Sequence, residues 1–230
     1  MKKRIELVGI IAIMSIIGFT MVSCGDSGSG DPSIPGHTHS WGAWSVTTAP
    51  NFSTPTAGEE TRTCSGCGTS EKQPYPIRNI GDTGPGGGVI FYRSGTAFGS
   101  NWHYLEATSS ATNVAWSLTF ANVTGATGIA IGAGKDNTTA IITAHPGDAN
   151  NAAKATQGTI GGKRDWFLPS KDELNEMYNA RINLGISSGW YWSSSQVTSN
   201  TAWAQDFASG SQSYVDTKDI LNIVRAIRAF

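Results

Sequence analysis

Short apolar runs bounded by glycine, serine and asparagine recur along the chain after residue 88. Runs of four to eight such residues between turn-forming residues are typical of β-strands, because aromatic and β-branched side chains pack well on a pleated surface. The pattern predicts strands at residues 89–92, 102–107, 114–116, 166–168, 190–193, 202–207, 214–215 and 223–227.

Two stretches between these strands have helical features. The first lies between residues 136 and 157, is rich in alanine and asparagine, and contains a break at His145-Pro146-Gly147. In the second, Ser170 and Glu173 have the spacing of a capping box, and apolar residues follow at helical spacing, namely Leu174, Met177, Tyr178 and Ile182. This spacing predicts a helix over residues 170–184 that ends before Gly185.

The first residues have the pattern of an export signal. Lys2, Lys3 and Arg4 precede a mostly apolar run over residues 7–22, which Ser23 and Cys24 follow. The end of the run resembles the lipobox of bacterial lipoproteins, which implies cleavage before Cys24 and a lipid on its sulfur. The alternative is a transmembrane helix, but the run is at the short end of the roughly 17–25 residues that a span requires. We therefore expect residues 1–23 to be a signal peptide.

Composition divides the remaining chain into three parts. Residues 24–36 start at the lipidated Cys24 and continue with mainly glycine, serine and proline, which is typical of a flexible tether. Residues 37–77 form a small cysteine-containing β module that is too short to bury much core unaided. Residues 78–230 contain the apolar runs listed above and form the main domain.

Four side chains in the module are candidate metal ligands. His37, His39, Cys64 and Cys67 offer four nitrogen and sulfur atoms, the number that a closed structural zinc site requires. A single C-x-x-C pair leaves a disulfide or a free dithiol as the alternatives. A redox enzyme is disfavoured, because no βαβ pattern surrounds the pair. The segment also resembles a short module of bacterial surface proteins that reads H-x-W-x-x-W and then R-T-C-x-x-C-G, with a further cysteine that residues 49–61 lack.

Composition and charge narrow the class of function. The chain of 230 residues contains 28 glycines and 8 tryptophans, which favours turn-rich β structure over a helical bundle. The formal net charge is −1, and no cluster of lysine and arginine occurs beyond the first four residues. Nucleic acid is therefore not an expected partner, because its binding requires clustered positive charge.

The order of motifs in residues 80–230 is similar to one known family. The most specific motifs are W-F-L-P-S-x-x-E-L from Trp166, Y-W-S-S from Tyr191 and V-R-A-I-R-A-F from Val224. They resemble the Lcl C-terminal domain family of bacterial adhesin-like proteins. The resemblance implies an α+β fold, a C-type-lectin-like mixed sheet with two helical regions, which here follows the small β-rich module.

The same resemblance implies binding outside the cell and no catalytic residues. The best-known associations of the family are adhesion and the binding of carbohydrate or glycosaminoglycan. Calcium is not expected, because the Glu-Pro-Asn, Gln-Pro-Asp and Trp-Asn-Asp motifs of calcium-dependent lectins do not occur. A serine hydrolase is not expected either, because residues 193–195 lack the Gly-x-Ser-x-Gly pattern of a nucleophile elbow.

Most of the tryptophan and arginine side chains in the last third of the chain are expected in the interior of the main domain. Trp166 and Trp192 are expected in the core, because aromatic residues contribute the largest buried areas. Arg225 and Arg228 are expected in a structural charge network, because a buried guanidinium is costly without a carboxylate partner. The candidate partners are Asp165, Glu173 and Asp206.

Ligand contacts are expected from the polar loops at residues 193–200 and 209–214, since loops on a rigid scaffold carry most recognition. The candidate ligand-binding residues are Trp190, Ser195, Gln205, Gln212 and Tyr214. We predict a lipid-anchored protein of the cell envelope that binds a glycan or another extracellular ligand. The alternative is a structural protein that contacts another envelope protein. An exposed aromatic ring among amides favours the first function, and a contiguous apolar patch favours the second.

Overall fold

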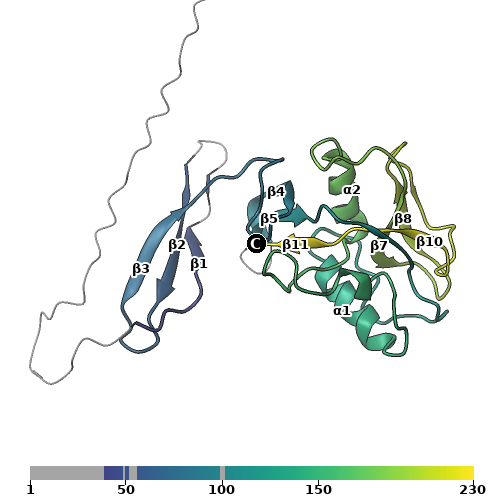
Figure 1. Ribbon diagram of the computed structural model, residues 1–230, viewed down its shortest axis with the longest axis horizontal. Coiled ribbons are helices and arrows are strands. Elements are labelled where there is room, and N and C mark those ends of the chain that lie inside the picture. Colours follow the sequence, from purple (N-terminus) through teal and green to yellow (C-terminus); the bar gives the residue numbers. More distant parts are fainter. Residues whose placement is uncertain (1–38, 49, 52–55, 99–101) are drawn as a thin grey trace, which may run out of the picture.

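The computed structural model describes residues 39–48, 50–51, 56–98 and 102–230. A small three-stranded sheet precedes a larger body of two further sheets and two helices (Figure 1). The expected signal peptide, Cys24, the tether and His37 lie outside the described residues. Within the described part of the chain, no helix has both the length and the apolar character needed to cross a membrane.

The small module is an antiparallel sheet with the order β1-β2-β3. Its strands are β1 (Ser45–Thr48), β2 (Gly58–Thr63) and β3 (Ser70–Tyr75). A turn from Cys64 to Gly68 joins β2 to β3, and the N–H of Gly68 donates to the carbonyl of Cys64 at 2.9 Å. Gly68 has a φ of +73°, which an L side chain rarely adopts. The C-x-x-C-G motif therefore closes a tight hairpin.

Two sheets form the scaffold of the larger domain. The first has the order β11-β5-β4, with β4 (Val89–Phe98), β5 (Trp102–Ala107) and β11 (Ile227–Ala229). The second has the order β6-β10-β7-β8-β9, with β6 (Thr112–Ala115), β7 (Trp190–Gln196), β8 (Ala202–Asp206), β9 (Gln212–Ser213) and β10 (Leu221–Val224). It is mixed, because β10 pairs with β7 in parallel and the other pairs are antiparallel. The α+β class is confirmed.

Two helices pack between and beside the sheets. Helix α1 (Gly134–Ala144) ends at His145, where the sequence predicted a break, and a 3₁₀ turn follows at Lys154–Thr156. Helix α2 (Lys171–Asn179) begins with the predicted capping box of Ser170 and Glu173. The predicted end of this helix is wrong, because the chain leaves the helix at Ala180 and continues in turns. Ile182, assigned to the apolar face, is 85% exposed.

Three strand predictions need correction. Residues 166–168 are not a strand, although Phe167 forms an isolated bridge with Ile227. The short strand predicted at 214–215 lies at Gln212–Ser213. Residues 223–227 belong to two strands, because Arg225 and Ala226 carry the chain from the five-stranded sheet to the three-stranded one. Apolar residues continue through this crossover, so their pattern cannot mark it.

The described residues form two large apolar clusters, one beside each helix, and a smaller third cluster of Tyr75, Ile90 and Tyr104. Leu174 and Met177 of α2 pack with β4, β5, β7 and β11, and Ile141 of α1 packs with Trp192 and Val224. Trp166 and Trp192 are buried as predicted, and their indole N–H groups donate to the carbonyls of Ile160 and Val114. Each ring therefore contributes buried area without leaving its polar atom unsatisfied.

A buried ion pair joins β5 to β11 in the three-stranded sheet. Glu106 of β5 is fully buried and accepts a hydrogen bond from Nη1 of Arg228 at 3.0 Å. Arg228 also contacts Asp165 through Nε at 2.6 Å, which confirms Asp165 as a partner. The N–H groups of Gly86 and Gly88 each donate to the Glu106 carboxylate at 2.9 Å. A Cβ at Gly86 would lie 2.8 Å from Oε1 of Glu106, so this loop requires glycine.

The other predicted charge partners were wrong. Glu173 accepts from the backbone N–H groups of Ser170 and Gly132, and it therefore caps α2 instead of pairing with an arginine. Asp206 accepts from its own loop, from the N–H groups of Ala208 and Ser209. Arg225 is buried and donates to the carbonyls of Thr108 and Leu184. Backbone N–H and carbonyl groups thus provide the hydrogen-bond partners that were expected from charged side chains.

Candidate functional site

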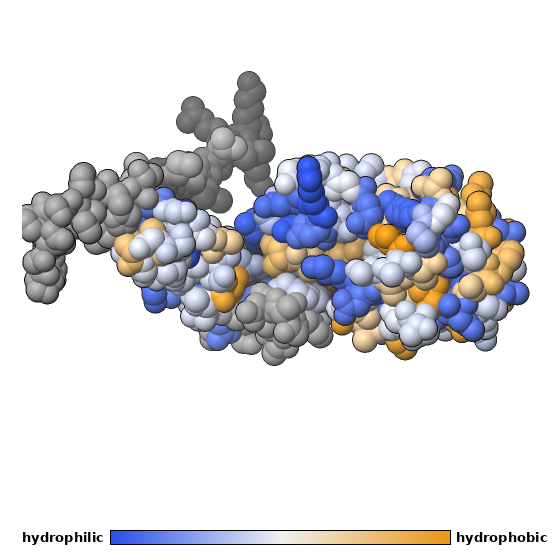
Figure 2. Space-filling model, turned by 90° about the horizontal axis from the view of Figure 1, so that it is seen from below, coloured by the Kyte–Doolittle hydropathy of each residue, from blue (hydrophilic) through white to orange (hydrophobic). Residues whose placement is uncertain are grey.

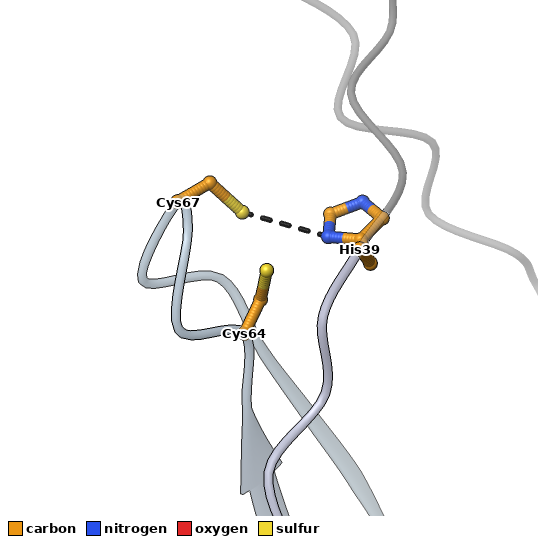
Figure 3. A group of neighbouring side chains, drawn as sticks. All are labelled: His39, Cys64 and Cys67. Atoms are coloured by element: carbon orange, nitrogen blue, oxygen red, sulfur yellow. Dashed lines mark hydrogen bonds between the residues drawn. The ribbon is translucent and has the colours of Figure 1, made fainter.

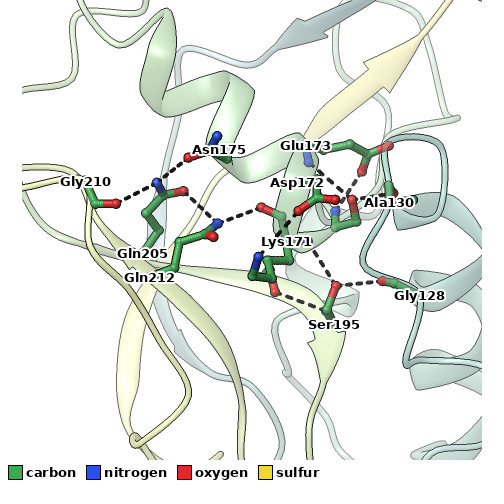
Figure 4. A network of polar contacts seen from close by, with 12 residues as sticks. Gly128, Ala130, Lys171, Asp172, Glu173, Asn175, Ser195, Gln205, Gly210 and Gln212 are labelled. Carbon is green, nitrogen blue, oxygen red and sulfur yellow. Dashed lines mark hydrogen bonds and ion pairs between the residues drawn. The ribbon is translucent and has the colours of Figure 1, made fainter.

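Two of the predicted ligand residues lie in a buried polar network beside α2 (Figure 4). The hydroxyl of Ser195 accepts from the N–H of Lys171 at 2.9 Å and donates to the carbonyl of Gly128 at 2.7 Å. The side-chain amide of Gln205 donates to Asn175 at 3.0 Å and to the carbonyl of Gly210 at 3.1 Å. Both side chains are fully buried. These two side chains hold β7 and β8 against α2. Because both are buried, neither is proposed as a ligand contact.

The remaining residues of this region form an exposed surface along β8 and β9. Tyr214 is 49% exposed and meets half-buried Trp203 edge to face, with 4.8 Å between ring centroids and 72° between ring planes. Nζ of Lys171 lies 4.9 Å from the Trp203 ring. Gln212 donates to the carbonyl of Lys171 at 2.9 Å (Figure 4). We call the group Lys171, Trp203, Gln212 and Tyr214 the aromatic edge.

Trp190, a further candidate ligand-binding residue, is exposed, but it is not part of the aromatic edge. It pairs with Asp206, which lies three residues after Trp203 on β8. Side chains an odd number of residues apart on a strand point to opposite faces of the sheet. Trp190 and Trp203 therefore lie on different faces, and one small ligand cannot stack on both.

A second candidate site lies in the module, where His39, Cys64 and Cys67 meet (Figure 3). One potential ligand atom from each side chain lies within 4.8 Å of the others. Nδ1 of His39 is 3.5 Å from Sγ of Cys67, and both cysteines are free thiols. The fourth predicted ligand, His37, lies outside the described residues.

The electrostatics of this cluster favour a thiolate. Burial raises the pKa of Cys64, but hydrogen bonds from His39 and from the N–H groups of Cys67 and Gly66 outweigh it and lower the pKa overall. The pKa of His39 is raised, first by its hydrogen bond with Cys64. A thiolate is the form that binds metal ions and reacts with electrophiles.

A cleft of about 770 Å³ separates the module from the larger domain. Trp44 and Tyr75 line it from the module, and Arg78, Lys135 and Phe230 line it from the larger domain. The Tyr75 hydroxyl and Nε of Arg78 are buried and have no hydrogen-bond partner among the described residues. No local pattern could indicate this cleft, because its walls come from segments far apart in the chain.

Comparison with known proteins gives little support for a family. No family model matches the chain, and no curated protein matches it, so membership of the Lcl C-terminal domain family is not confirmed. One similar solved structure is a fimbrial protein from Bacteroides ovatus ATCC 8483, with 10% identity and a TM-score of 0.44. The similarity covers 76% of this chain and 57% of that one, so the chain spans little more than half of its length. A likeness this distant carries no information about function.

Proposed function

We propose that the chain is a lipid-anchored binding protein of the cell envelope that recognises a glycan at the aromatic edge. The observation that carries this proposal is the exposed ring of Tyr214, which rests on Trp203 beside a side-chain amide and an ammonium group. Aromatic faces suit the apolar C–H faces of sugar rings, and a few fixed polar groups supply orientation. The proposed activity is binding, without catalysis and without calcium.

The backbone holds the aromatic edge rigid. Strands β8 and β9 pair through Ala204 with Ser213 and through Gln205 with Gln212. The hydrogen bond from Gln212 to the carbonyl of Lys171 ties β9 to the start of α2. A surface that is ordered before binding loses little conformational entropy when the ligand arrives. This arrangement favours recognition over a purely structural role for the exposed ring.

The position of the aromatic edge is consistent with display away from a membrane. In Figure 1, β8 lies at the end of the larger domain that is remote from the module. The predicted lipid on Cys24 and the tether precede the module in the sequence. Lipid on a cysteine retains a protein at a bilayer by burying its acyl chains. We therefore expect the binding surface to face away from the membrane, whether the protein is anchored at the outer membrane, at the cell surface or on the periplasmic face.

A glycan array tests this function. The full chain with Cys24→Ser would be screened with calcium and with chelator, beside Tyr214→Ala and the matched control Trp190→Ala. We expect saturable binding, independent of calcium, that Tyr214→Ala weakens at least about tenfold, the loss expected for a contact worth about 1.4 kcal/mol. Trp190→Ala should retain it, because Trp190 is exposed on the other face of the sheet. Equal losses in both variants would contradict the proposal, and loss in Arg78→Ala alone would move the site to the cleft.

A specific observation also favours a second function, the binding of another envelope protein. Leu118, Phe120, Ile220 and Leu221 are exposed, and they come from paired segments, since the N–H of Ser117 donates to Lys218 and Leu221 pairs with Ala115. On the face shown in Figure 2, hydrophobic colour is scattered and is more frequent on the half of the larger domain that is remote from the module. Contiguous exposed apolar surface is typical of protein contacts.

Adhesion to a surface before and after enzymatic removal of its glycans separates the two functions. Glycan recognition predicts that deglycosylation abolishes adhesion, that Tyr214→Ala weakens it and that Leu221→Glu does not change it. Protein recognition predicts the reverse, because a carboxylate at an exposed apolar contact would have to lose its water on binding.

A further inference from the structure

Two distant segments bring His39, Cys64 and Cys67 together through backbone hydrogen bonds. Trp41 forms a β-bridge with Cys64, and the N–H of Gly42 donates to the carbonyl of Thr63 at 3.0 Å. The N–H of Ser65 donates to the carbonyl of Ser40 at 2.9 Å. The segment that carries His39 is thus paired with the hairpin that carries both cysteines. Backbone pairing therefore brings His39 close to Cys64 and Cys67. Their proximity does not depend on the conformations of three flexible side chains alone.

The hairpin turns both thiols towards the histidine (Figure 3). The N–H of Cys64 donates to the carbonyl of Thr69 at 2.8 Å, and the N–H of Gly68 donates back to Cys64. The hydroxyl of Thr69 lies 3.2 Å from Sγ of Cys67. Backbone N–H groups that point at a sulfur stabilise its charged form, as the lowered pKa of Cys64 reflects.

Stacking holds the ring of His39 in place. The ring stacks on Trp41, with 4.8 Å between centroids and 18° between planes. The guanidinium of Arg62 lies 4.7 Å from the Trp41 ring and 4.8 Å from the Trp44 ring, and it pairs with Glu71. Trp41 and Arg62 therefore act as positioning residues for the histidine, much as outer partners orient the ligands of metal sites.

The module also lacks the core that would stabilise it without a cross-link. Among the described Val, Trp, Tyr and Cys side chains from residue 39 to residue 75, only Cys64 and Tyr75 are buried. Cys64 lies at the hairpin end, and Tyr75 packs on the larger domain with Ile90 and Tyr104. Domains of this size generally need a disulfide or a structural metal. The hairpin end is where such a cross-link has its ligands.

We propose that His39, Cys64 and Cys67 bind one Zn²⁺ ion that staples the N-terminal segment to the β2–β3 hairpin. Thiolate and imidazole ligands select zinc over magnesium or calcium, which prefer oxygen. Three protein ligands leave the fourth tetrahedral position to a water or an added ligand. Binding displaces the thiol proton from each cysteine that is still protonated, so the affinity falls as pH is lowered. This site is independent of the proposed glycan surface.

Metal content and cobalt substitution test the site directly. The full chain with Cys24→Ser has only Cys64 and Cys67 as thiols. We expect one zinc ion per chain by mass spectrometry, and a sulfur-to-cobalt charge-transfer band when Co²⁺ replaces it. His39→Ala, Cys64→Ser and Cys67→Ser should each weaken Co²⁺ binding at least tenfold. Thr48→Ala, an exposed change in β1 of the same module, should bind as the parent does.

Amide hydrogen exchange tests the site in the unaltered protein, so that the test does not depend on variants that could fail to fold. In the unaltered module, chelation should accelerate amide exchange in β2 and β3, and added Zn²⁺ should restore protection. Exchange in β7 and β10 serves as the internal reference and should not change. A Cys64–Cys67 disulfide in the exported chain, seen as a mass lower by two hydrogens, would overturn the proposal. So would the absence of a stoichiometric Co²⁺ complex after reduction.

Discussion

The larger domain buries an ion pair, whereas the ion pairs of the module are exposed. In the module, Arg62 pairs with Glu71 and Lys72 pairs with Glu59, and all four side chains are at least 29% exposed. In the larger domain, Glu106 is fully buried beneath Arg228 and two backbone N–H groups. Exposed pairs contribute little because water competes for both partners, whereas removing one partner of a buried pair leaves a charge without solvent.

Chain length explains the difference. A segment of about forty residues buries too small a fraction of its surface to desolvate ion pairs, whereas a domain of about 150 residues can enclose them. The same charged residue types therefore act differently in the two regions. In the module they form weak contacts at the surface, and in the larger domain they form a buried pair whose disruption costs much free energy. The two regions should therefore differ in how they respond to substitution.

The largest expected effect is that of Glu106→Gln. The neutral amide cannot compensate the charge of Arg228, and its NH2 group would replace an oxygen that accepts from Arg228 or from a glycine N–H, so the larger domain should lose about 3–5 kcal/mol of unfolding free energy. Chemical denaturation followed by the fluorescence of buried Trp116 and Trp192 measures it. Glu59→Gln, in an exposed pair of the module, should cost less than about 1 kcal/mol. Equal costs would remove the distinction between the two regions.

The next largest expected effect is a pH dependence of the stability of the larger domain. Lys218 is fully buried, its Nζ donates to the carbonyl of Ala121 and to Gln196, and burial lowers its pKa to about 8. From this pKa up to the ordinary value of 10.5, the unfolded chain binds more protons than the folded one, so stability rises with pH. The rise should amount to about 3 kcal/mol.

Comparison with Lys218→Met isolates this contribution, because other groups titrate in the same range. The variant should lack the rise that the parent shows in denaturation midpoints over this window. Lys72→Met, which changes an exposed lysine of the module, should keep the parental slope. A Lys218→Met chain whose stability follows that of the parent at every pH would show that the buried ammonium has no altered pKa.

A smaller effect is expected for Arg62→Ala in the module. The change removes an exposed ion pair and two cation–π contacts, each worth about 0.5–1 kcal/mol, and should cost about 1–2 kcal/mol in total. Amide exchange of β2 and β3 reports this loss without interference from the larger domain. Lys72→Ala removes an ion pair without stacking and should cost less. A larger cost for Lys72→Ala would contradict the role assigned to stacking.

The smallest effect is expected for Ser170→Ala, at about 1 kcal/mol. The change removes the side-chain cap of the first turn of α2. Thr143→Ala, an exposed position in α1, should be nearly neutral and provides the matched comparison. Thermal unfolding of the larger domain measures both. A neutral Ser170→Ala would show that packing of Leu174 and Met177 is sufficient to fix this helix.

Features set by neighbouring residues were predictable from the sequence. The capping box of α2 was correct because both of its partners lie within one helical turn, and the burial of Trp192 followed from its size. The Ser-rich residues 193–195 were assigned to a loop, but β7 extends to Gln196 and all three serines are buried. The hydroxyl of Ser195 accepts from the start of α2 and donates to the carbonyl of Gly128, and such contacts with distant segments cannot be inferred from polarity alone.

Contacts between distant residues were only partly predictable. Asp165 was anticipated as a partner of Arg228, but Glu106 was not, although it is the buried partner. The two residues are 122 positions apart, and nothing near Glu106 in the sequence marks it as buried. In the module, the three candidate ligands that the structure describes were identified from residue type alone. Their mutual approach depends on the pairing of Trp41 with Cys64.

The last strands determine when the larger domain can fold. β10 pairs with β6 and β7 in one sheet, and β11 pairs with β5 in the other. A chain that emerges from a ribosome or an export channel, N-terminus first, delivers these residues after every other strand. Neither sheet can close before then, and pairings over such separations form slowly. The larger domain therefore completes both of its sheets only once residues 221–229 have emerged.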